Sequence, residues 1–337
     1  MQECNNAIAG ARRLRLHCCI LAFLQFCLLV LSASPSSAGE RYALIVTGAS
    51  GGSPYAEKYL KWRVSIVNVL REKFGYAEDH LIVLAEEPAG GVRKATREGV
   101  QSALADFRRR VSKDDQLLVL LIGHGTAGDA EGGKFNLVGP DLTADEWAAL
   151  LKPIAGKLVF IDTTGGSFPF LRKLAGHGRI VLTATDSAAQ QFETVFPEYF
   201  IKAFDDAAAD FDRNGRVSLW EAFSYASAGV RQWFDQRGQL STERALLDDT
   251  GAGIGREAQN PGTDGIVARV TYLEPEASVA SGDAALEALL KRKEDLEAQV
   301  EALKARKATM APEQYQAELE KLLLELARVS QAIRSKT

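Results

Sequence analysis

One segment of the sequence, Asp210 to Glu221, places oxygen-bearing side chains at regular intervals. Counting Asp210 as position 1, these side chains stand at positions 1, 3, 5, 9 and 12, which are Asp210, Asp212, Asn214, Ser218 and Glu221. Calcium is a hard cation that takes about six to eight oxygen ligands in flexible geometry. The main-chain carbonyl of Arg216, at position 7, adds an oxygen, and the Glu221 carboxylate can bind through both of its oxygens. The segment therefore predicts a Ca²⁺ site.

The remaining positions of this segment match the loop of an EF-hand. Gly215 at position 6 permits the sharp turn, and Val217 supplies an aliphatic residue at position 8. Apolar residues recur at helical spacing in 196–209 and 219–234, where the motif requires flanking helices. The alternative is an ordinary polar loop that leads into a helix. A single loop in an exported protein is expected to be a structural site, with a Kd on the order of 10⁻⁴ to 10⁻³ M.

A second group of residues has the types needed for nucleophilic catalysis. His124 follows the apolar run 117–122 and stands between two glycines, and Thr164 and Ser167 follow the run 157–162. If the two runs are adjacent parallel strands, their carboxyl ends meet at the sheet edge where open α/β folds bind ligands. A histidine at this edge can serve as general base toward a hydroxyl group. The alternative is that His124 caps its strand and hydrogen-bonds within its own loop.

In this region the chain resembles the caspase and legumain clan of cysteine peptidases. In that clan a His-Gly pair follows one strand, and an Asp-Ala-Cys-x-Ser-Gly type of segment follows the next. Here these places are taken by His124-Gly125 and by the segment from Asp162 to Ser167, and the resemblance covers residues 42–185. The resemblance implies that His124 is the general base and that Thr164 stands in the nucleophile position.

The chain also resembles a group of exported bacterial proteins. These combine such an α/β region with an EF-hand, a Thr-Glu-x-Ala-Leu-Leu-Asp-Asp segment and a terminal helical hairpin. Residues Thr242 to Asp249 carry that segment here.

Threonine in place of cysteine at position 164 argues against peptidase activity. A thiol provides an appreciable thiolate fraction near neutral pH, whereas an alcohol needs strong base assistance. Threonine nucleophiles usually use their own N-terminal amine, which an internal residue lacks. We therefore expect an inactive peptidase-like domain that serves as a binding or assembly module. The alternative is a hydrolase in which His124 activates Thr164 or Ser167.

Alternating apolar and amphipathic stretches indicate the elements that position these residues. The apolar runs are predicted strands at 42–47, 80–84, 116–122, 157–162 and 179–185, with a further strand at 266–273. Helices are predicted at 53–74, at 96–110 and from Thr143, where Glu146 completes a capping box. Continuously apolar strands are typical of a parallel sheet covered on both faces. The expected fold of residues 39–273 is α/β and caspase-like, an open, mostly parallel sheet flanked by helices, with the EF-hand inserted at 210–221.

Residues 1–38 have the pattern of a secretory signal peptide. Three arginines precede the apolar run 20–31, and small residues end at Ala38. The run is short for a membrane-spanning helix, and an uncleaved anchor is the alternative. Cleavage predicts a periplasmic or extracellular protein without a membrane span. All four cysteines precede residue 28, so the mature chain would contain neither a thiol nor a disulfide.

The composition excludes several classes of protein. With 46% hydrophobic and 25% charged residues, the chain is neither disordered throughout nor a multi-span membrane protein. The whole chain has 40 basic and 44 acidic residues, and loss of three arginines and one glutamate with the leader leaves 37 and 43. No basic stripe indicates a nucleic-acid partner.

The last part of the chain has a different pattern. Apolar residues spaced by three and four predict two helices, interrupted at Ala311-Pro312. We expect an antiparallel coiled-coil hairpin over 283–337, after a linker at 274–282. Lys293 stands at a core position of the pattern, where it weakens the pairing or sets its register. The apolar stripe is covered either within the hairpin or by another chain, through self-association or a protein partner.

Overall fold

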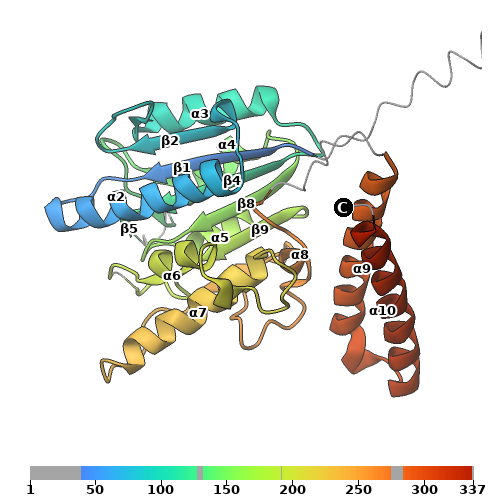
Figure 1. The fold of residues 1–337 in the computed structure, drawn as a ribbon. Coiled ribbons are helices and arrows are strands. Elements are labelled where there is room, and N and C mark those ends of the chain that lie inside the picture. Colours follow the sequence, from blue (N-terminus) through green and yellow to red (C-terminus); the bar gives the residue numbers. More distant parts are fainter. Residues whose placement is uncertain (1–38, 127–131, 191, 275–283, 336–337) are drawn as a thin grey trace, which may run out of the picture. The chain divides into compact units, whose positions relative to one another are not determined.

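The computed structural model describes residues 39–126, 132–190, 192–274 and 284–335 (Figure 1). The predicted signal peptide at 1–38 lies outside the described residues. Of the predicted linker, only Glu274 lies within them. No helix within these ranges is both long enough and apolar enough to cross a membrane.

Seven strands form the main sheet, in the order β10-β9-β8-β4-β1-β2-β3. Every adjacent pair is parallel except β9 and β10, which are antiparallel. The mixed α/β fold with a mostly parallel sheet is thus confirmed, whereas the edge strand β10 was not predicted. The strands are β1 (Arg41–Thr47), β2 (Leu81–Ala85), β3 (Arg93–Lys94), β4 (Gln116–Ile122), β8 (Lys157–Asp162), β9 (Arg179–Thr183) and β10 (Leu246–Asp248).

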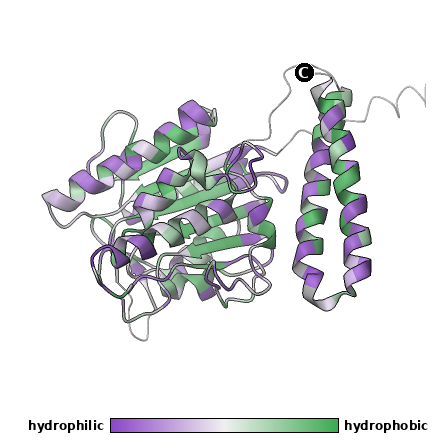
Figure 2. Cartoon of the chain, turned by 60° about the horizontal axis from the view of Figure 1, so that its bottom comes forward, coloured by the Kyte–Doolittle hydropathy of each residue, from purple (hydrophilic) through white to green (hydrophobic). Residues whose placement is uncertain are grey.

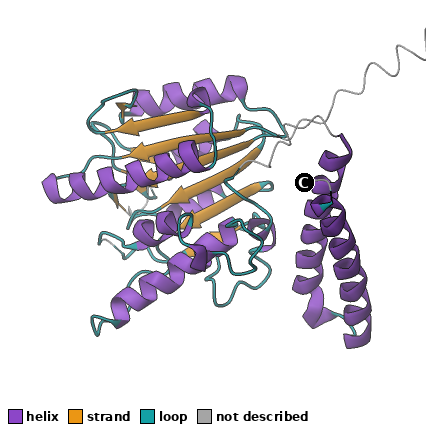
Figure 3. Cartoon of the chain, viewed as in Figure 1, coloured by secondary structure: helices purple, strands orange, loops and turns teal. Residues whose placement is uncertain are grey.

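Helices cover both faces of this sheet (Figure 3). Successive strand residues point to opposite faces, so Ala43 and Ile45 of β1 pack in one apolar cluster and Leu44 and Val46 in another. The first cluster includes side chains of α2 (Ser53–Asn68), α6 (Phe196–Ala203) and α7 (Leu219–Asp235); the second includes those of α3 (Arg97–Arg110), α4 (Ala144–Leu151) and α5 (Phe168–Leu174). Burial on both faces explains the continuous apolarity of the strands, which Figure 2 shows in green.

Local capping sets where two of these helices begin. The Thr96 hydroxyl accepts the amide of Gly99 at the start of α3, at 3.1 Å. At α4, Thr143 and Glu146 form the predicted capping box, with the Glu146 amide 3.2 Å from the Thr143 hydroxyl and the Thr143 amide 2.9 Å from the carboxylate. Helix α2 continues into a π-helical turn at Val69–Lys73, which accounts for the predicted helix 53–74.

A small antiparallel sheet follows β4 in the chain. It contains β5 (Gly125–Thr126), β6 (Lys134–Phe135) and β7 (Leu142–Thr143). The amide of Asn136 donates to the carbonyl of His124 at 3.1 Å. This sheet thereby holds the chain that follows β4 in place.

The predicted strand at 266–273 was wrong. Residues Ile266–Arg269 form the short helix α8, and only Tyr272 makes an isolated β-bridge. The cause is the buried Asp249 carboxylate, which accepts the amides of Gly265 at 2.8 Å and Ala268 at 2.9 Å and so caps the helical turn.

The predicted helix at 196–209 is interrupted. Helix α6 ends at Ala203, and a 3₁₀ turn follows at Ala207–Ala209. Asp206 separates the two, because its carboxylate accepts the amide of Ala208 at 3.0 Å and the hydroxyl of Tyr225 at 2.6 Å. Such side-chain capping starts a new turn rather than continuing the old one.

Two long helices form the C-terminal part, α9 (Ala284–Arg306) and α10 (Pro312–Arg334), with a 3₁₀ turn at Lys307–Thr309 between them. They lie side by side in Figures 1 and 2. Lys293 is not a buried core residue; it pairs with Glu297 one turn later at 3.4 Å. Buried stripe residues include Leu296, Val300 and Leu303 of α9 and Val329 of α10.

Candidate functional site

Three carboxylates of the 210–221 loop come together in the structure. Oxygen atoms of Asp210, Asp212 and Glu221 all lie within 4.8 Å of one another. Asp210 follows the 3₁₀ turn at Ala207–Ala209, and Glu221 belongs to the first turn of α7. Crowding three acids at this distance favours a divalent cation among them, because a cation offsets their mutual repulsion.

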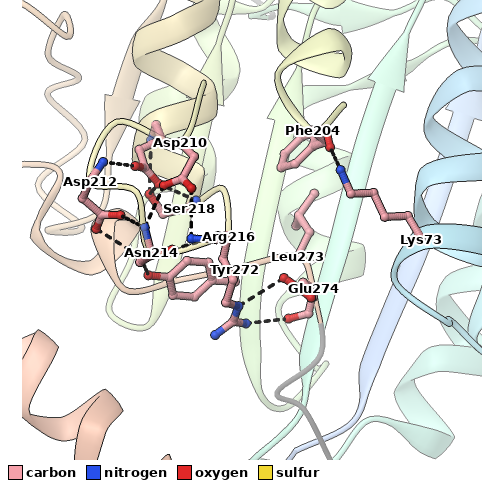
Figure 4. A network of polar contacts seen from close by, with 12 residues as sticks. Lys73, Phe204, Asp210, Asp212, Asn214, Arg216, Ser218, Tyr272, Leu273 and Glu274 are labelled. Carbon is pink, nitrogen blue, oxygen red and sulfur yellow. Dashed lines mark hydrogen bonds and ion pairs between the residues drawn. The ribbon is translucent and has the colours of Figure 1, made fainter. Parts of the chain in front are cut away.

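The main chain of the loop is wrapped around the Asp210 side chain (Figure 4). Its carboxylate accepts the amide of Asn214 at 3.0 Å and that of Gly215 at 2.9 Å. Gly215 has a φ of 87°, in the left-handed region that favours glycine, so the turn predicted at this position is present. Arg213 has a φ of 57°, the one non-glycine residue of the described ranges in that region.

Glu221 ties the two ends of the loop together. One carboxylate oxygen accepts the amides of Phe211 at 2.9 Å and Asp212 at 3.3 Å. The other accepts the amide of Ser218 at 2.8 Å and its hydroxyl at 2.7 Å. Glu221 and Ser218 also form the capping box of α7, so Glu221 has both a structural and a candidate ligand role.

The neutral candidate ligands are engaged with the protein. The Asn214 side chain donates to Asp212 at 3.0 Å and accepts the amide of Arg216 at 2.8 Å. Ser218 is 3% exposed, and its hydroxyl is held by Glu221. The three carboxylates are therefore the immediate donor set, with Asn214 beside them.

The electrostatics of the loop favour a cation as well. Burial raises the pKa of Asp212, and the negative charges of Glu221 and Asp210 raise it further. A raised pKa means that the ionised form of Asp212 is destabilised by its surroundings, so the negative charges of the loop cost free energy. A bound cation would lower that cost.

Residues far along the chain, which no sequence pattern indicated, pack against this loop. Ser218 forms an antiparallel β-bridge with Tyr272, and the amide of Leu219 donates to the carbonyl of Thr271 at 2.9 Å. The Arg216 guanidinium lies 3.9 Å from the centre of the Tyr272 ring. No local pattern could reveal these contacts, because the contacting residues lie more than fifty positions apart in the sequence.

The second predicted group lies at the carboxyl ends of adjacent strands. β4 and β8 are parallel neighbours, so the loops that carry His124 and Thr164 start side by side, as expected. The His124 ring is enclosed by two tyrosines, with ring centres at 4.7 Å for Tyr55 and 5.5 Å for Tyr59. Its position is thus determined by α2 as much as by β4.

Both ring nitrogens of His124 have protein partners. Nε2 lies 3.1 Å from the carbonyl oxygen of Ser50, which requires a hydrogen on Nε2. The Tyr59 hydroxyl lies nearly equidistant from the two nitrogens, 3.2 Å from Nε2 and 3.3 Å from Nδ1. In this tautomer, assigned from the hydrogen bonds, Nδ1 carries the lone pair that a general base needs.

Thr164 and Ser167 are buried, and neither hydroxyl pairs with His124. Thr164 is 0% exposed, and its hydroxyl has no hydrogen-bond partner among the described residues. A Cβ placed on Gly125 would lie 2.3 Å from that hydroxyl, so the chain after β4 closes directly over it. The Ser167 hydroxyl accepts the amides of Ala184 at 3.1 Å and Thr185 at 3.2 Å, which ties two loops together.

Two acidic side chains, those of Asp162 and Glu243, are buried in the α/β fold. Asp162, at the end of β8, is 0% exposed and accepts the amide of Thr164 at 2.9 Å. Glu243 accepts the amides of Val195 at 2.9 Å and Phe196 at 3.3 Å at the start of α6. Burial raises the pKa of each to about 7.

Because burial raises the pKa of Asp162 and Glu243, we expect their contribution to the free energy of unfolding to fall as the pH rises from ~4 to ~7. In the unfolded chain carboxyl groups titrate near pH ~4, so between pH ~4 and ~7 the native state holds more protons than the unfolded state. We expect Asp162→Asn, which keeps an oxygen for the Thr164 amide, to flatten the decline. Urea unfolding at pH 5 and pH 8 measures it; an equal decline in wild type and Asp162→Asn would contradict the assignment.

Comparison with known proteins places the chain in no family. No family model matches it, and no curated protein matches its sequence. Among solved structures, the crystal structure of protein GSU0716 from Geobacter sulfurreducens is similar, with 14% sequence identity and a TM-score of 0.41. The match covers 62% of this chain and 92% of the other.

Proposed function

We propose that this protein is an exported calcium-binding protein whose caspase-like domain is catalytically inactive and serves as a binding or assembly module. The observation that carries the proposal is the convergence of Asp210, Asp212 and Glu221 within 4.8 Å, in a loop that also has glycine at position 6. Calcium suits this donor set because it accepts many oxygens and a bidentate carboxylate in flexible geometry. Magnesium requires near-ideal octahedral geometry and gives up its water reluctantly.

The function of the site would be structural. A Kd on the order of 10⁻⁴ to 10⁻³ M suits calcium-rich surroundings outside the cytosol. Asp210 and Glu221 join α7 to the turn before the loop, so a cation between them would hold these two elements together. Export is inferred from the leader pattern of residues 1–38.

Thermal unfolding of the full chain with and without Ca²⁺ tests the proposal. At about 10 mM Ca²⁺, a site with this affinity raises the free energy of unfolding by about 1.4 to 2.7 kcal/mol. We expect a clear increase in Tm with Ca²⁺ and a much smaller one with Mg²⁺. Equal increases with both ions would show a nonspecific charge effect instead.

The inactivity of the domain rests on the geometry around His124. The Ser50 carbonyl and the Tyr59 hydroxyl are hydrogen-bond partners of its ring, and the Thr164 hydroxyl is fully buried. The hydrolase alternative needs an accessible hydroxyl beside a free base. Turnover of a peptide library that is lost in His124→Ala would restore that alternative.

The helices α9 and α10 are the proposed assembly element. Leu323 and Leu324 of α10 are 47% and 52% exposed, and two adjacent leucines half in water favour a further chain as partner. We expect light scattering to show a mass above that of the monomer for the full chain. Replacing both leucines by lysine should return the mass to the monomer, whereas Gln316→Lys on the same helix should leave it unchanged. A monomeric wild-type chain would contradict the proposal that these helices mediate self-association.

A further inference from the structure

The residues that follow α8 form a partner surface for the 210–221 loop. Thr271, Tyr272 and Leu273 are each less than 8% exposed. Ser218 bridges to Tyr272, and Leu219 donates its amide to Thr271. The loop thus has a β-type contact along residues 218–219, although the sequence holds no second loop of its kind to supply one.

Two candidate ligand residues also contact this segment through their side chains (Figure 4). The amide nitrogen of Asn214 donates to the Tyr272 hydroxyl at 3.1 Å. Arg216, whose carbonyl is a candidate ligand, places its guanidinium over the Tyr272 ring and pairs with Glu274, at 3.2 Å from the carboxylate and 3.1 Å from the carbonyl. Tyr272 therefore constrains two positions of the loop, 5 and 7.

The same segment is held from its other side by the α/β fold. The Tyr76 hydroxyl donates to the carbonyl of Leu273 at 2.9 Å. The side chain of Gln116, the first residue of β4, donates to the carbonyl of Tyr272 at 3.1 Å. Residues 271–274 are thus clamped between the main sheet and the loop. They are also the last described residues before the chain continues toward α9.

We propose that Tyr272 and Arg216 couple cation binding in the loop to the docking of residues 271–274. The inference rests on the proposed Ca²⁺ site and names the residues that set its affinity and its effect. Tyr272 holds the Asn214 amide and the Arg216 side chain in place before the ion binds, which reduces the ordering that binding requires. The coupling is reciprocal: an ion that orders the loop must stabilise the docked segment by the same factor.

In this proposal, Ca²⁺ binding strengthens the attachment of residues 271–274, which precede the C-terminal helices in the chain, to the α/β fold. Bound Ca²⁺ fixes the point at which the chain leaves the α/β fold, at Glu274. Without the ion, the loop holds the segment less firmly. Tyr272 and Arg216 are positioning residues, because their side chains act on the site through other groups.

Two variants measured by calcium titration of the full chain test the coupling. Tyr272→Phe removes the hydroxyl that meets Asn214 but keeps the ring, and we expect about threefold to tenfold weaker Ca²⁺ binding. Arg216→Ala keeps the candidate carbonyl ligand and removes both side-chain contacts, and we expect about tenfold weaker binding. Tyr225→Phe is the matched control, because its hydroxyl bonds Asp206 outside the loop; it should bind as wild type.

Hydrogen exchange of the wild-type chain tests the reciprocal effect and needs no variant. Ca²⁺ should slow exchange in peptides covering 268–274 and at the Leu219 amide by about fivefold or more. In Arg216→Ala this protection should be largely lost. If the wild-type chain binds no Ca²⁺, the proposed site itself fails. If it binds Ca²⁺, but both variants bind equally well and exchange at 268–274 does not change, the site stands and the coupling is wrong.

Discussion

Replacing Glu221 by glutamine is expected to abolish Ca²⁺ binding, weakening it at least ~100-fold so that no binding is detected up to about 10 mM. Glu221 is the candidate bidentate ligand and one of the three carboxylates within 4.8 Å. Glutamine removes one negative charge and one of the two ligand oxygens. It also leaves only one acceptor where two now receive the amides of Phe211 and Ser218.

The loss of Ca²⁺ binding must be separated from a loss of folding. Glu221 is 5% exposed, so removing its charged hydrogen bonds should cost about 1 to 3 kcal/mol even without an ion. Urea unfolding in the absence of Ca²⁺ measures that cost. Glu198→Gln is the matched control, because it makes the same change in the first turn of α6. A folded Glu221→Gln chain that binds Ca²⁺ as tightly as wild type would remove this residue from the site.

A cysteine placed at position 164 is expected to stay unreactive. In Thr164→Cys the thiol would occupy a position that is 0% exposed and closed over by Gly125. Its alkylation requires local opening of the fold, so we expect a rate at least ~100-fold below that of Thr126→Cys, an exposed position two residues after His124. Mass spectrometry of the peptides around 164 and 126 distinguishes these thiols from the four cysteines of the leader.

The same variant bears on the inactive-domain proposal. A peptidase site that lacked only its thiol would regain a nucleophile, and His124 would activate it. We expect no peptide cleavage, because residue 164 is 0% exposed and the His124 ring is hydrogen-bonded to Ser50 and Tyr59 instead. Rapid alkylation of Cys at 164 that slows in a His124→Ala background, or measurable cleavage, would show that the site is open and competent.

Local patterns predicted those features whose causes lie within a few residues. The strands β1, β4 and β8 follow from continuous apolar runs, because both faces of the sheet are covered. The capping box of Thr143 and Glu146 spans four residues and was predicted correctly. The acidic loop was found for the same reason. Its candidate ligands lie within twelve consecutive residues, and the turn at Gly215 depends on that residue alone.

The errors came from interactions between distant residues. An apolar run such as 266–273 fits a strand or a helix equally well, and the carboxylate of Asp249 decides for the helix α8. The partners of His124 could not be predicted either, because Tyr59 lies 65 positions earlier in the sequence. Tyr272 was missed for the same reason. In each case a contact made only in the folded chain determines the local role.

Calcium titration of the wild-type chain by isothermal calorimetry tests the central claim most directly. We expect about one Ca²⁺ ion to bind per chain, with a Kd on the order of 10⁻⁴ to 10⁻³ M and no comparable heat from Mg²⁺. The measurement should be made on the full chain after dialysis against a chelator. No heat of binding up to about 10 mM Ca²⁺, ten times the weakest expected Kd, would contradict it.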